Sequence, residues 1–226
     1  MNMNFRSARC ARGLLLFLFS GMWAAGGAHA LPLLSEVYYD APGSDDGQSF
    51  VELAGEPGES LDGYTLEGLN GHNGVVGPTI ILSGMIGTGG LFVVADQTSS
   101  GTSSVLGADL LANFDFQNGP DSVVLRWGET IVDALGYGVF APGEFFAGEG
   151  TPAPDVSAGN SLARIFANLD RDDNAADFEI LAAPTPGQAS FAVVPEPGSA
   201  VLLGLGLVGL GAGGGKKAKV RIRRSG

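Results

Sequence analysis

Short runs of aliphatic, β-branched and aromatic residues alternate with clusters of Gly, Pro, Asn and Asp between residue 31 and about residue 190. Val, Ile, Leu, Phe and Tyr dominate these runs, as expected for strands that form a pleated, half-buried surface. The clusters between them include Asn70-Gly71 and Asn118-Gly119, dipeptides that favour tight turns. The pattern predicts strands at residues 33–39, 49–53, 64–68, 79–82, 91–95, 122–127, 131–135, 161–166 and 178–181.

The alternation within each run predicts which side chains face the core. In the run 33–39, the odd-numbered residues from Leu33 to Tyr39 share one face, whereas the run 91–95 is apolar throughout and is expected to be buried on both sides. No window combines helical periodicity with caps over ten or more residues, and residues 141–160 form a Gly-, Pro- and acid-rich surface loop. Many short strands with frequent turns predict one all-β domain over residues 31–190, a β-sandwich or a barrel.

Two further apolar runs lie at the ends of the chain, and the first indicates export. Three arginines precede an apolar stretch over residues 14–25, and small residues follow it up to Ala28-His29-Ala30. A basic region, a short apolar region and an A-x-A-like site define a secretory signal peptide. The apolar stretch is also shorter than the roughly 20 residues that a membrane span needs. We therefore expect residues 1–30 to be removed by signal peptidase, with cleavage after Ala30.

The second apolar run has a different surrounding sequence. The motif Pro195-Glu196-Pro197 ends a linker over residues 191–197, and residues 198–215 are 18 uncharged residues, about 27 Å long as a helix. Six Lys and Arg residues lie in the tail 216–226. Because positive charge stays on the cytoplasmic side, this pattern predicts a single hydrophobic transmembrane helix that places Glu196 at the outer face of the inner membrane.

The charge distribution excludes one class of partner. Nine of the 12 basic residues lie in the two end segments, so residues 31–194 hold three basic residues against 23 acidic ones, a net charge of −20. Nucleic-acid affinity depends on Lys and Arg that neutralise phosphates, and we therefore expect no nucleic-acid partner. The single cysteine, Cys10, belongs to the predicted signal peptide, so the mature domain has no disulfide and no zinc–thiolate site.

Catalytic chemistry has little support in the sequence. The predicted mature domain keeps one histidine, His72, in a run of Asn and Gly that indicates a solvated turn. Neither a G-x-S-x-G nor an H-E-x-x-H motif is present. Paired carboxylates for a hydrolase stay open as an alternative, although 23 acidic residues make some suggestive pair inevitable. We predict a protein that is not an enzyme.

One acidic loop has the spacing of a metal-binding segment. Asp170, Asp172 and Asn174 place oxygen ligands at alternate positions, which suits a hard cation such as Ca²⁺. The match to an EF-hand loop then fails, because Ala175 stands at the glycine position and Leu181 at the position of the bidentate glutamate. The alternative is that these residues form a turn before a strand.

The order of motifs resembles that of a bacterial lamin-tail domain. The matching blocks are Ser35-Glu36-Val37-Tyr38-Tyr39-Asp40, Phe50-Val51-Glu52-Leu53, Leu61-Asp62-Gly63-Tyr64-Thr65-Leu66, Phe92-Val93-Val94-Ala95-Asp96, residues 117–125, residues 132–138, Ser161-Leu162-Ala163-Arg164, residues 172–178 and Pro184-Thr185-Pro186-Gly187. The resemblance implies an immunoglobulin-like β-sandwich with a structural or interaction role rather than a catalytic one.

The C-terminal segment is similar to a PEP-CTERM sorting signal, on the basis of Pro195-Glu196-Pro197, the apolar run and the basic cluster in that order. This resemblance implies a Gram-negative bacterium, cleavage near the motif by an exosortase, and transient association with the inner membrane. The expected destination is the cell surface, the outer membrane or the extracellular space. We expect a structural or adhesive protein whose partners are extracellular polysaccharide or surface proteins; the alternative is a calcium-dependent module that binds a glycan or a protein.

Overall fold

The computed structural model describes residues 30–193. The signal peptide predicted over residues 1–30, apart from Ala30, lies outside this range. So do the motif Pro195–Pro197, the helix predicted over residues 198–215 and the tail 216–226. Between residues 30 and 193, no helix has the length and apolar character needed to cross a membrane.

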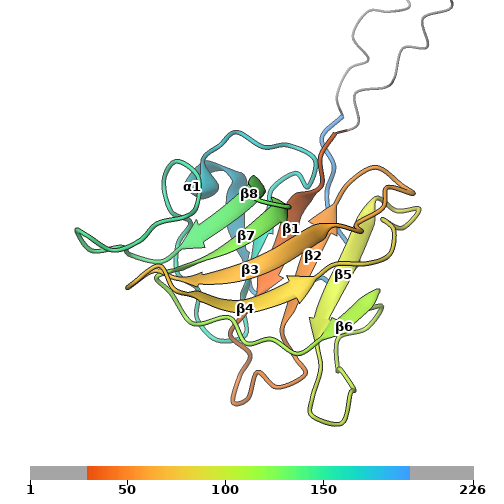
Figure 1. The fold of residues 1–226 in the computed structure, drawn as a ribbon, viewed down its shortest axis with the longest axis horizontal. Helices are drawn as coiled ribbons and strands as arrows, with labels where there is room; N and C mark the ends of the chain where they lie inside the picture. The colour runs from red at the N-terminus through yellow and green to blue at the C-terminus, as the bar shows by residue number, and fades with distance from the viewer. Residues whose placement is uncertain (1–29, 194–226) are drawn as a thin grey trace, which may run out of the picture.

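The described part of the chain folds into two β-sheets and one short helix (Figure 1). In chain order the elements are β1 (Leu33–Tyr38), β2 (Phe50–Ala54), β3 (Tyr64–Asn70), β4 (Val76–Ile81), β5 (Leu91–Asp96), β6 (Leu110–Ala112), β7 (Asp121–Trp127), β8 (Thr130–Tyr137), β9 (Ser161–Arg164), α1 (Asn174–Asp177) and β10 (Phe178–Leu181). One sheet has the order β10-β9-β1-β2-β5-β6 and the other the order β4-β3-β7-β8. Neighbouring strands are antiparallel except for β5 and β6, which are parallel.

Side chains from both sheets meet in one hydrophobic core, so the predicted all-β sandwich is confirmed. The six-stranded sheet contributes residues such as Val51, Leu53 and Phe92, and the four-stranded sheet contributes residues such as Leu66 and Leu125. These side chains are at most 2% exposed. Apolar burial is the dominant favourable term in folding, and this core forms from residues 30–193, which contain no cysteine and therefore no disulfide.

The first strand corrects one prediction from the sequence. Leu33 and Ser35 do not share a face with Val37 and Tyr39, because the register against β2 shifts between Leu34 and Glu36. This β-bulge places Leu34 in the core together with Val37 and Tyr39. Ser35 is instead turned to the outer face of the sheet, where its hydroxyl donates to Glu52.

The other predicted strands are all present, with ends that differ by at most two residues except at β4, which begins at Val76 rather than at residue 79. The sequence pattern missed β6 and α1. These elements have three and four residues, which is too short for any periodicity to appear.

Loops cover parts of both outer faces of the sandwich. The predicted surface loop over residues 141–160 lies in part on the four-stranded sheet, where Ala147 packs against Leu69 and Val124. On the six-stranded sheet, Val105 packs against Phe50 and Val93. The strand 91–95 is therefore buried on both sides, as predicted.

Candidate functional site

A buried arginine lies at the end of β9. Arg164 follows Leu162 at the alternate position of the strand, so its side chain enters the interior and is fully buried (0% exposed). Its Nη2 donates to both carboxylate oxygens of Asp133, each at 2.9 Å, and its Nε donates to the carbonyl of Leu34 at 3.0 Å. Because Asp133 belongs to the four-stranded sheet and Arg164 to the six-stranded sheet, this ion pair joins the two layers.

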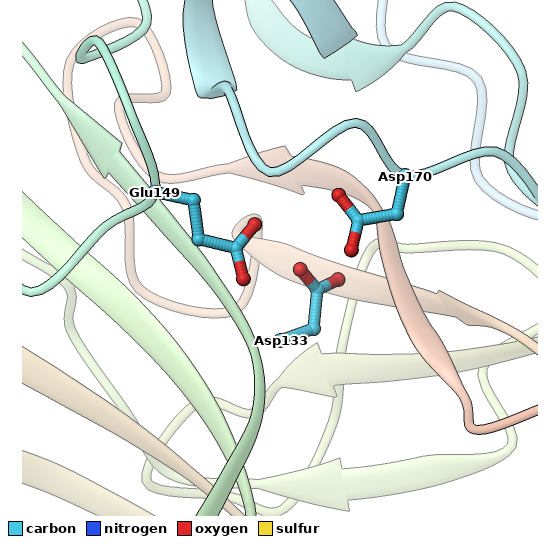
Figure 2. Close-up of side chains that lie close together, drawn as sticks. All are labelled: Asp133, Glu149 and Asp170. Carbon is cyan, nitrogen blue, oxygen red and sulfur yellow. The ribbon is translucent and has the colours of Figure 1, made fainter.

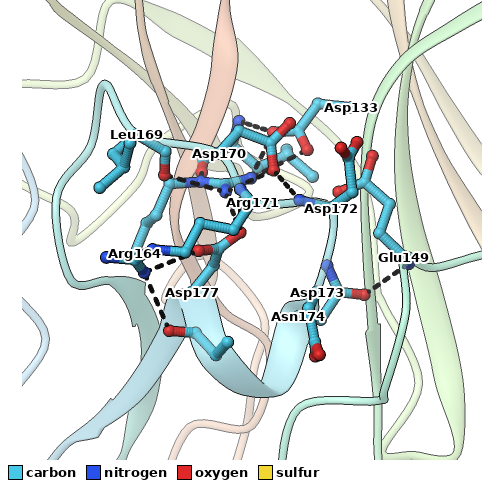
Figure 3. Close-up of polar contacts among 12 residues, drawn as sticks. Asp133, Glu149, Arg164, Leu169, Asp170, Arg171, Asp172, Asp173, Asn174 and Asp177 are labelled. Atoms are coloured by element: carbon cyan, nitrogen blue, oxygen red, sulfur yellow. Dashed lines mark hydrogen bonds and ion pairs between the residues drawn. The ribbon is translucent and has the colours of Figure 1, made fainter.

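The same guanidinium also holds the acidic loop before α1 (Figure 3). Nη1 of Arg164 lies 3.2 Å from Asp170 Oδ1 and 3.2 Å from Asp177 Oδ2. The carboxylate of Asp177 is fully buried and also accepts bonds from the backbone and the side chain of Arg171. The ring of Phe178 stacks 4.6 Å from the guanidinium carbon of Arg164. The buried charges are therefore paired and hydrogen-bonded, as burial in an apolar interior requires.

The three predicted calcium ligands have different environments. Asp170 Oδ1 accepts a bond from the backbone N–H of Asp172 at 3.0 Å, and Asp172 has a φ of 55°, so the segment forms the turn that was the alternative interpretation. Asn174 is buried, and its Oδ1 accepts bonds from the N–H groups of Gly136 and Glu149 at 2.8 and 2.9 Å. Both lone pairs of that oxygen are occupied, so Asn174 has none left for an ion.

Asn174 instead completes the edge of β8. Its Nδ2 donates to the carbonyl of Ala134 at 2.8 Å while its Oδ1 accepts from Gly136, so the amide occupies the position of a neighbouring strand. An unpaired strand edge has free N–H and C=O groups that favour aggregation. The side chain of Asn174 therefore links α1 to the sandwich and covers part of the edge of β8, the last strand of its sheet.

A group of three carboxylates not predicted from the sequence lies beside this loop (Figure 2). One oxygen each of Asp133, Glu149 and Asp170 lie within 4.8 Å of one another. Burial, followed by the nearby charge of Asp133, raises the pKa of Glu149 to about 8, and its buried Oε2 has no hydrogen-bond partner. At neutral pH, Glu149 is therefore largely protonated.

This group does not fit a calcium site. Asp133 Oδ2 accepts from the N–H of Leu34 and Oδ1 from that of Ala134, in addition to the two bonds from Arg164. A carboxylate offers about four lone pairs, and all four are used. The cation that neutralises Asp133 is the guanidinium of Arg164. A divalent ion bound to the same carboxylate would lie close to this positive charge and would be repelled by it.

Two other buried carboxylates lie on the outer face of the six-stranded sheet. Glu36 of β1 and Glu52 of β2 are register partners and are 1% and 0% exposed. Burial, with a smaller contribution from the charge of Glu36, raises the pKa of Glu52 to about 7. Each carboxylate accepts hydrogen bonds from a hydroxyl of the sheet: Ser161 donates to Glu36, and Ser35 donates to Glu52. These acids are thus occupied by structural bonds.

The remaining candidate residues are exposed. The His72 side chain is 83% exposed, in the predicted solvated turn, and its Nδ1 lies 3.5 Å from Glu144. Ala30, the predicted cleavage position, is also exposed.

Sequence reasoning missed Arg164, Asp133 and Asp177. One signal was available, because Arg164 is one of three basic residues in a segment of net charge −20 and stands at a strand position where the alternation from Leu162 calls for an apolar residue. Comparison of the chain with protein-family models, with curated proteins and with solved structures finds no match.

Proposed function

We propose that the chain is an exported, exosortase-sorted protein of the cell surface or the extracellular matrix. Its domain would be an immunoglobulin-like, lamin-tail-like sandwich with a structural or adhesive role rather than a catalytic one. Signal peptidase and exosortase are its processing partners, and extracellular polysaccharide or surface proteins are its partners after export. The two terminal sequence signals carry the first half of this proposal, and the shape of the domain supports it.

The supporting observation is the position of the two ends of the described chain. Ala30 and Phe191 line the same surface groove, and the two chain ends leave the same side of the sandwich (Figure 1). Ala30 is exposed and Val193 is 92% exposed. Cleavage at either end would therefore leave both sheets and the core intact. A domain attached at one side directs its opposite side and its loops away from the membrane.

The polar chemistry of the domain supports a structural role. Its three arginines are all paired with acids: Arg126 with Glu67, and Arg164 and Arg171 with Asp177. The unpaired surface charge is therefore strongly negative. Such a surface keeps a secreted protein soluble and repels polyanions, so it suits neutral glycans or proteins as partners.

Intact-mass analysis of the protein from membranes and from medium tests the proposal. In a host that carries an exosortase, we expect a species that begins at Leu31 and ends near Pro195–Pro197. Replacing Glu196 by Gln should leave the tail attached, whereas Glu179→Gln, an exposed acid of β10, is a matched control that should be processed normally. Recovery of a chain that retains residues 1–30 and 198–226 in the presence of the enzyme would refute the proposed function.

A further inference from the structure

A cavity of about 180 Å³ is lined by the hairpin that joins β3 to β4 and by the segment 115–117, which follows β6. Its shape depends on two glycines. The pairing of β3 with β4 is irregular between Glu67 and Leu69, so Gly68 lies in a β-bulge. Gly77 of β4 also lines the cavity, and a side chain at this position would first contact the carbonyl oxygen of Gly68, at 3.6 Å. A glycine inside a strand often marks a place where a ligand approaches the backbone.

Buried aromatic side chains support the walls of the cavity. Phe116 is 2% exposed, and its ring occupies the space that a side chain at Gly68 would need. Tyr137 is fully buried, and its hydroxyl donates to the carbonyl of Gln117 at 2.8 Å. The side-chain amide of Asn70 donates to Oε1 of Gln117, which ties β3 to the segment after β6. The cavity is therefore formed in advance, which lowers the entropic cost of binding a ligand.

Two amide side chains that line the cavity have NH₂ groups available as donors. Oδ1 of Asn73 accepts a bond from the N–H of Val75 at 2.9 Å, and Oε1 of Gln117 accepts from Asn70. These bonds use the amide oxygens and fix the orientation of each amide. Neither NH₂ group donates a hydrogen bond to another of residues 30–193, so both are left for a ligand.

Two carboxylates that line the same cavity supply acceptors. Oδ1 of Asp121 accepts from the N–H of Gly71 at 2.8 Å, whereas its Oδ2 has no hydrogen-bond partner in the described part of the chain. The same holds for both carboxylate oxygens of Asp115. The lining of the cavity includes no Lys and no Arg, so its charge is negative.

This combination of groups selects a ligand by its hydrogen-bonding chemistry. A phosphate or carboxylate is repelled by the two aspartates, and an ammonium group has no acceptor for the two amides. A hydroxyl both donates and accepts, so an uncharged molecule with several hydroxyls satisfies both kinds of group. A sugar ring also has an apolar C–H face, which suits the apolar part of the lining, Val75, Pro78 and Phe116. The cavity is smaller than the roughly 300–1,000 Å³ of sites for drug-sized ligands, a size that suits one sugar residue.

We propose that this cavity binds one residue of a neutral glycan, whose hydroxyls accept from Asn73 and Gln117 and donate to Asp115 and Asp121. The inference rests on the proposed function and extends it by naming the site and the class of glycan. The hairpin between β3 and β4 lies away from the side at which the two ends of the described chain leave the domain (Figure 1). A protein attached through either end therefore keeps the cavity accessible to a polymer.

The test is binding of the purified full chain to an array of neutral oligosaccharides, built from glucose, galactose, mannose and N-acetylglucosamine, and of oligosaccharides that contain uronic acids. We expect binding to at least one neutral glycan and none to the uronic acids. The double variant Asn73→Asp, Gln117→Glu keeps the oxygens that accept from Val75 and Asn70 and removes only the NH₂ donors. Its affinity should be at least tenfold lower, because the ligand hydroxyls lose their donors.

The matched control is Asn113→Asp, Gln97→Glu, which makes the same change of charge outside the cavity and should bind as wild type does. A second variant, Gly77→Leu, fills the cavity without removing a polar group, and the space beside Gly77 accommodates the new Cβ. It should also lose at least tenfold in affinity at an unchanged melting temperature. Its control is Gly89→Leu, at an exposed glycine outside the cavity with no neighbouring atom within 4 Å.

Three results would overturn the inference: no binding of wild type to any neutral glycan, equal binding to uronic acids, or unchanged affinity in either cavity variant. Each of them is measured on purified protein and leaves the proposed processing and export standing. Conversely, a chain that binds a neutral glycan through the cavity but keeps both terminal segments in the cell would refute the proposed sorting and not the site.

Discussion

Replacing Arg164 by methionine would remove the positive charge that joins the two sheets. Methionine keeps most of the length and volume of the side chain, so the change isolates the loss of charge and hydrogen bonds from the creation of a cavity. The variant leaves Asp133 and Asp177, both fully buried, without the guanidinium that each of them contacts.

The size of the effect follows from what each carboxylate keeps. Asp133 retains two backbone N–H donors, and Asp177 retains Arg171. Removing one partner of a buried ion pair costs about 3–5 kcal/mol, because an uncompensated charge stays behind. We expect Arg164→Met to lower the free energy of unfolding by about this amount, which is a large share of the total for a domain of this size.

Urea unfolding of the protein gives the measurement, and Arg126→Met is the matched control. Arg126 pairs with Glu67 at 2.7 Å, but the two side chains are 22% and 18% exposed. Loss of this half-buried surface pair should cost about 1 kcal/mol or less. Adding Asp133→Asn to Arg164→Met should recover part of the loss, because the buried charge is then removed as well. Equal destabilisation by Arg164→Met and Arg126→Met would refute the argument that burial makes this network important.

Three other predictions concern single features of the domain. Asn174→Ala should lower the unfolding free energy by about 2–4 kcal/mol in a urea titration, because buried groups of β8 lose their partners, whereas the exposed Asn113→Ala should have almost no effect. The pKa of Glu52 is raised from 4.5 to about 7, so its ionisation destabilises the fold. The free energy of unfolding of wild type, relative to that of Glu52→Gln, should therefore fall as pH rises from about 4.5 to about 7. A wild type that gains stability relative to the variant over this window would contradict the raised pKa of Glu52. Since Asn174 and Asp133 have no free lone pairs, millimolar calcium and a chelator should give the same melting temperature, and a clear rise with calcium would revive the metal site.

Most of the strand architecture could be predicted because the alternation of apolar and polar residues reports burial directly. The run 91–95 shows this well, since each face of that strand meets an apolar partner. The prediction failed for β1, where one extra residue between Leu34 and Glu36 inverts the faces. A bulge is set by the pairing with a neighbouring strand, and the residues of β1 alone contain no mark of it.

In the candidate site, too, some features could be predicted from the sequence and others could not. The acidic loop is visible in the sequence, but oxygen atoms at alternate positions are compatible with a turn as well as with a metal site. The role of Asn174 depends on its hydrogen bonds to β8, about 40 residues earlier in the chain. Glu36 and Glu52 lie within two strands predicted from the sequence, at residues 33–39 and 49–53. They are covered by the segment 184–192, which follows more than 130 residues later and donates hydrogen bonds to both carboxylates.

The sequence by itself determined the all-β class, the position of most strands and the acidic character of the domain, because these depend on local periodicity, composition and charge; the two terminal signals are predictions from the same kind of pattern. Only the tertiary structure decided which acids are buried and which group satisfies each of them. A carboxylate has the same local sequence signature in solvent and in the interior. Its partners, Arg164 for Asp133 and Thr185 for Glu36, come from distant parts of the chain and meet it only when the two sheets and the segment after β10 pack together.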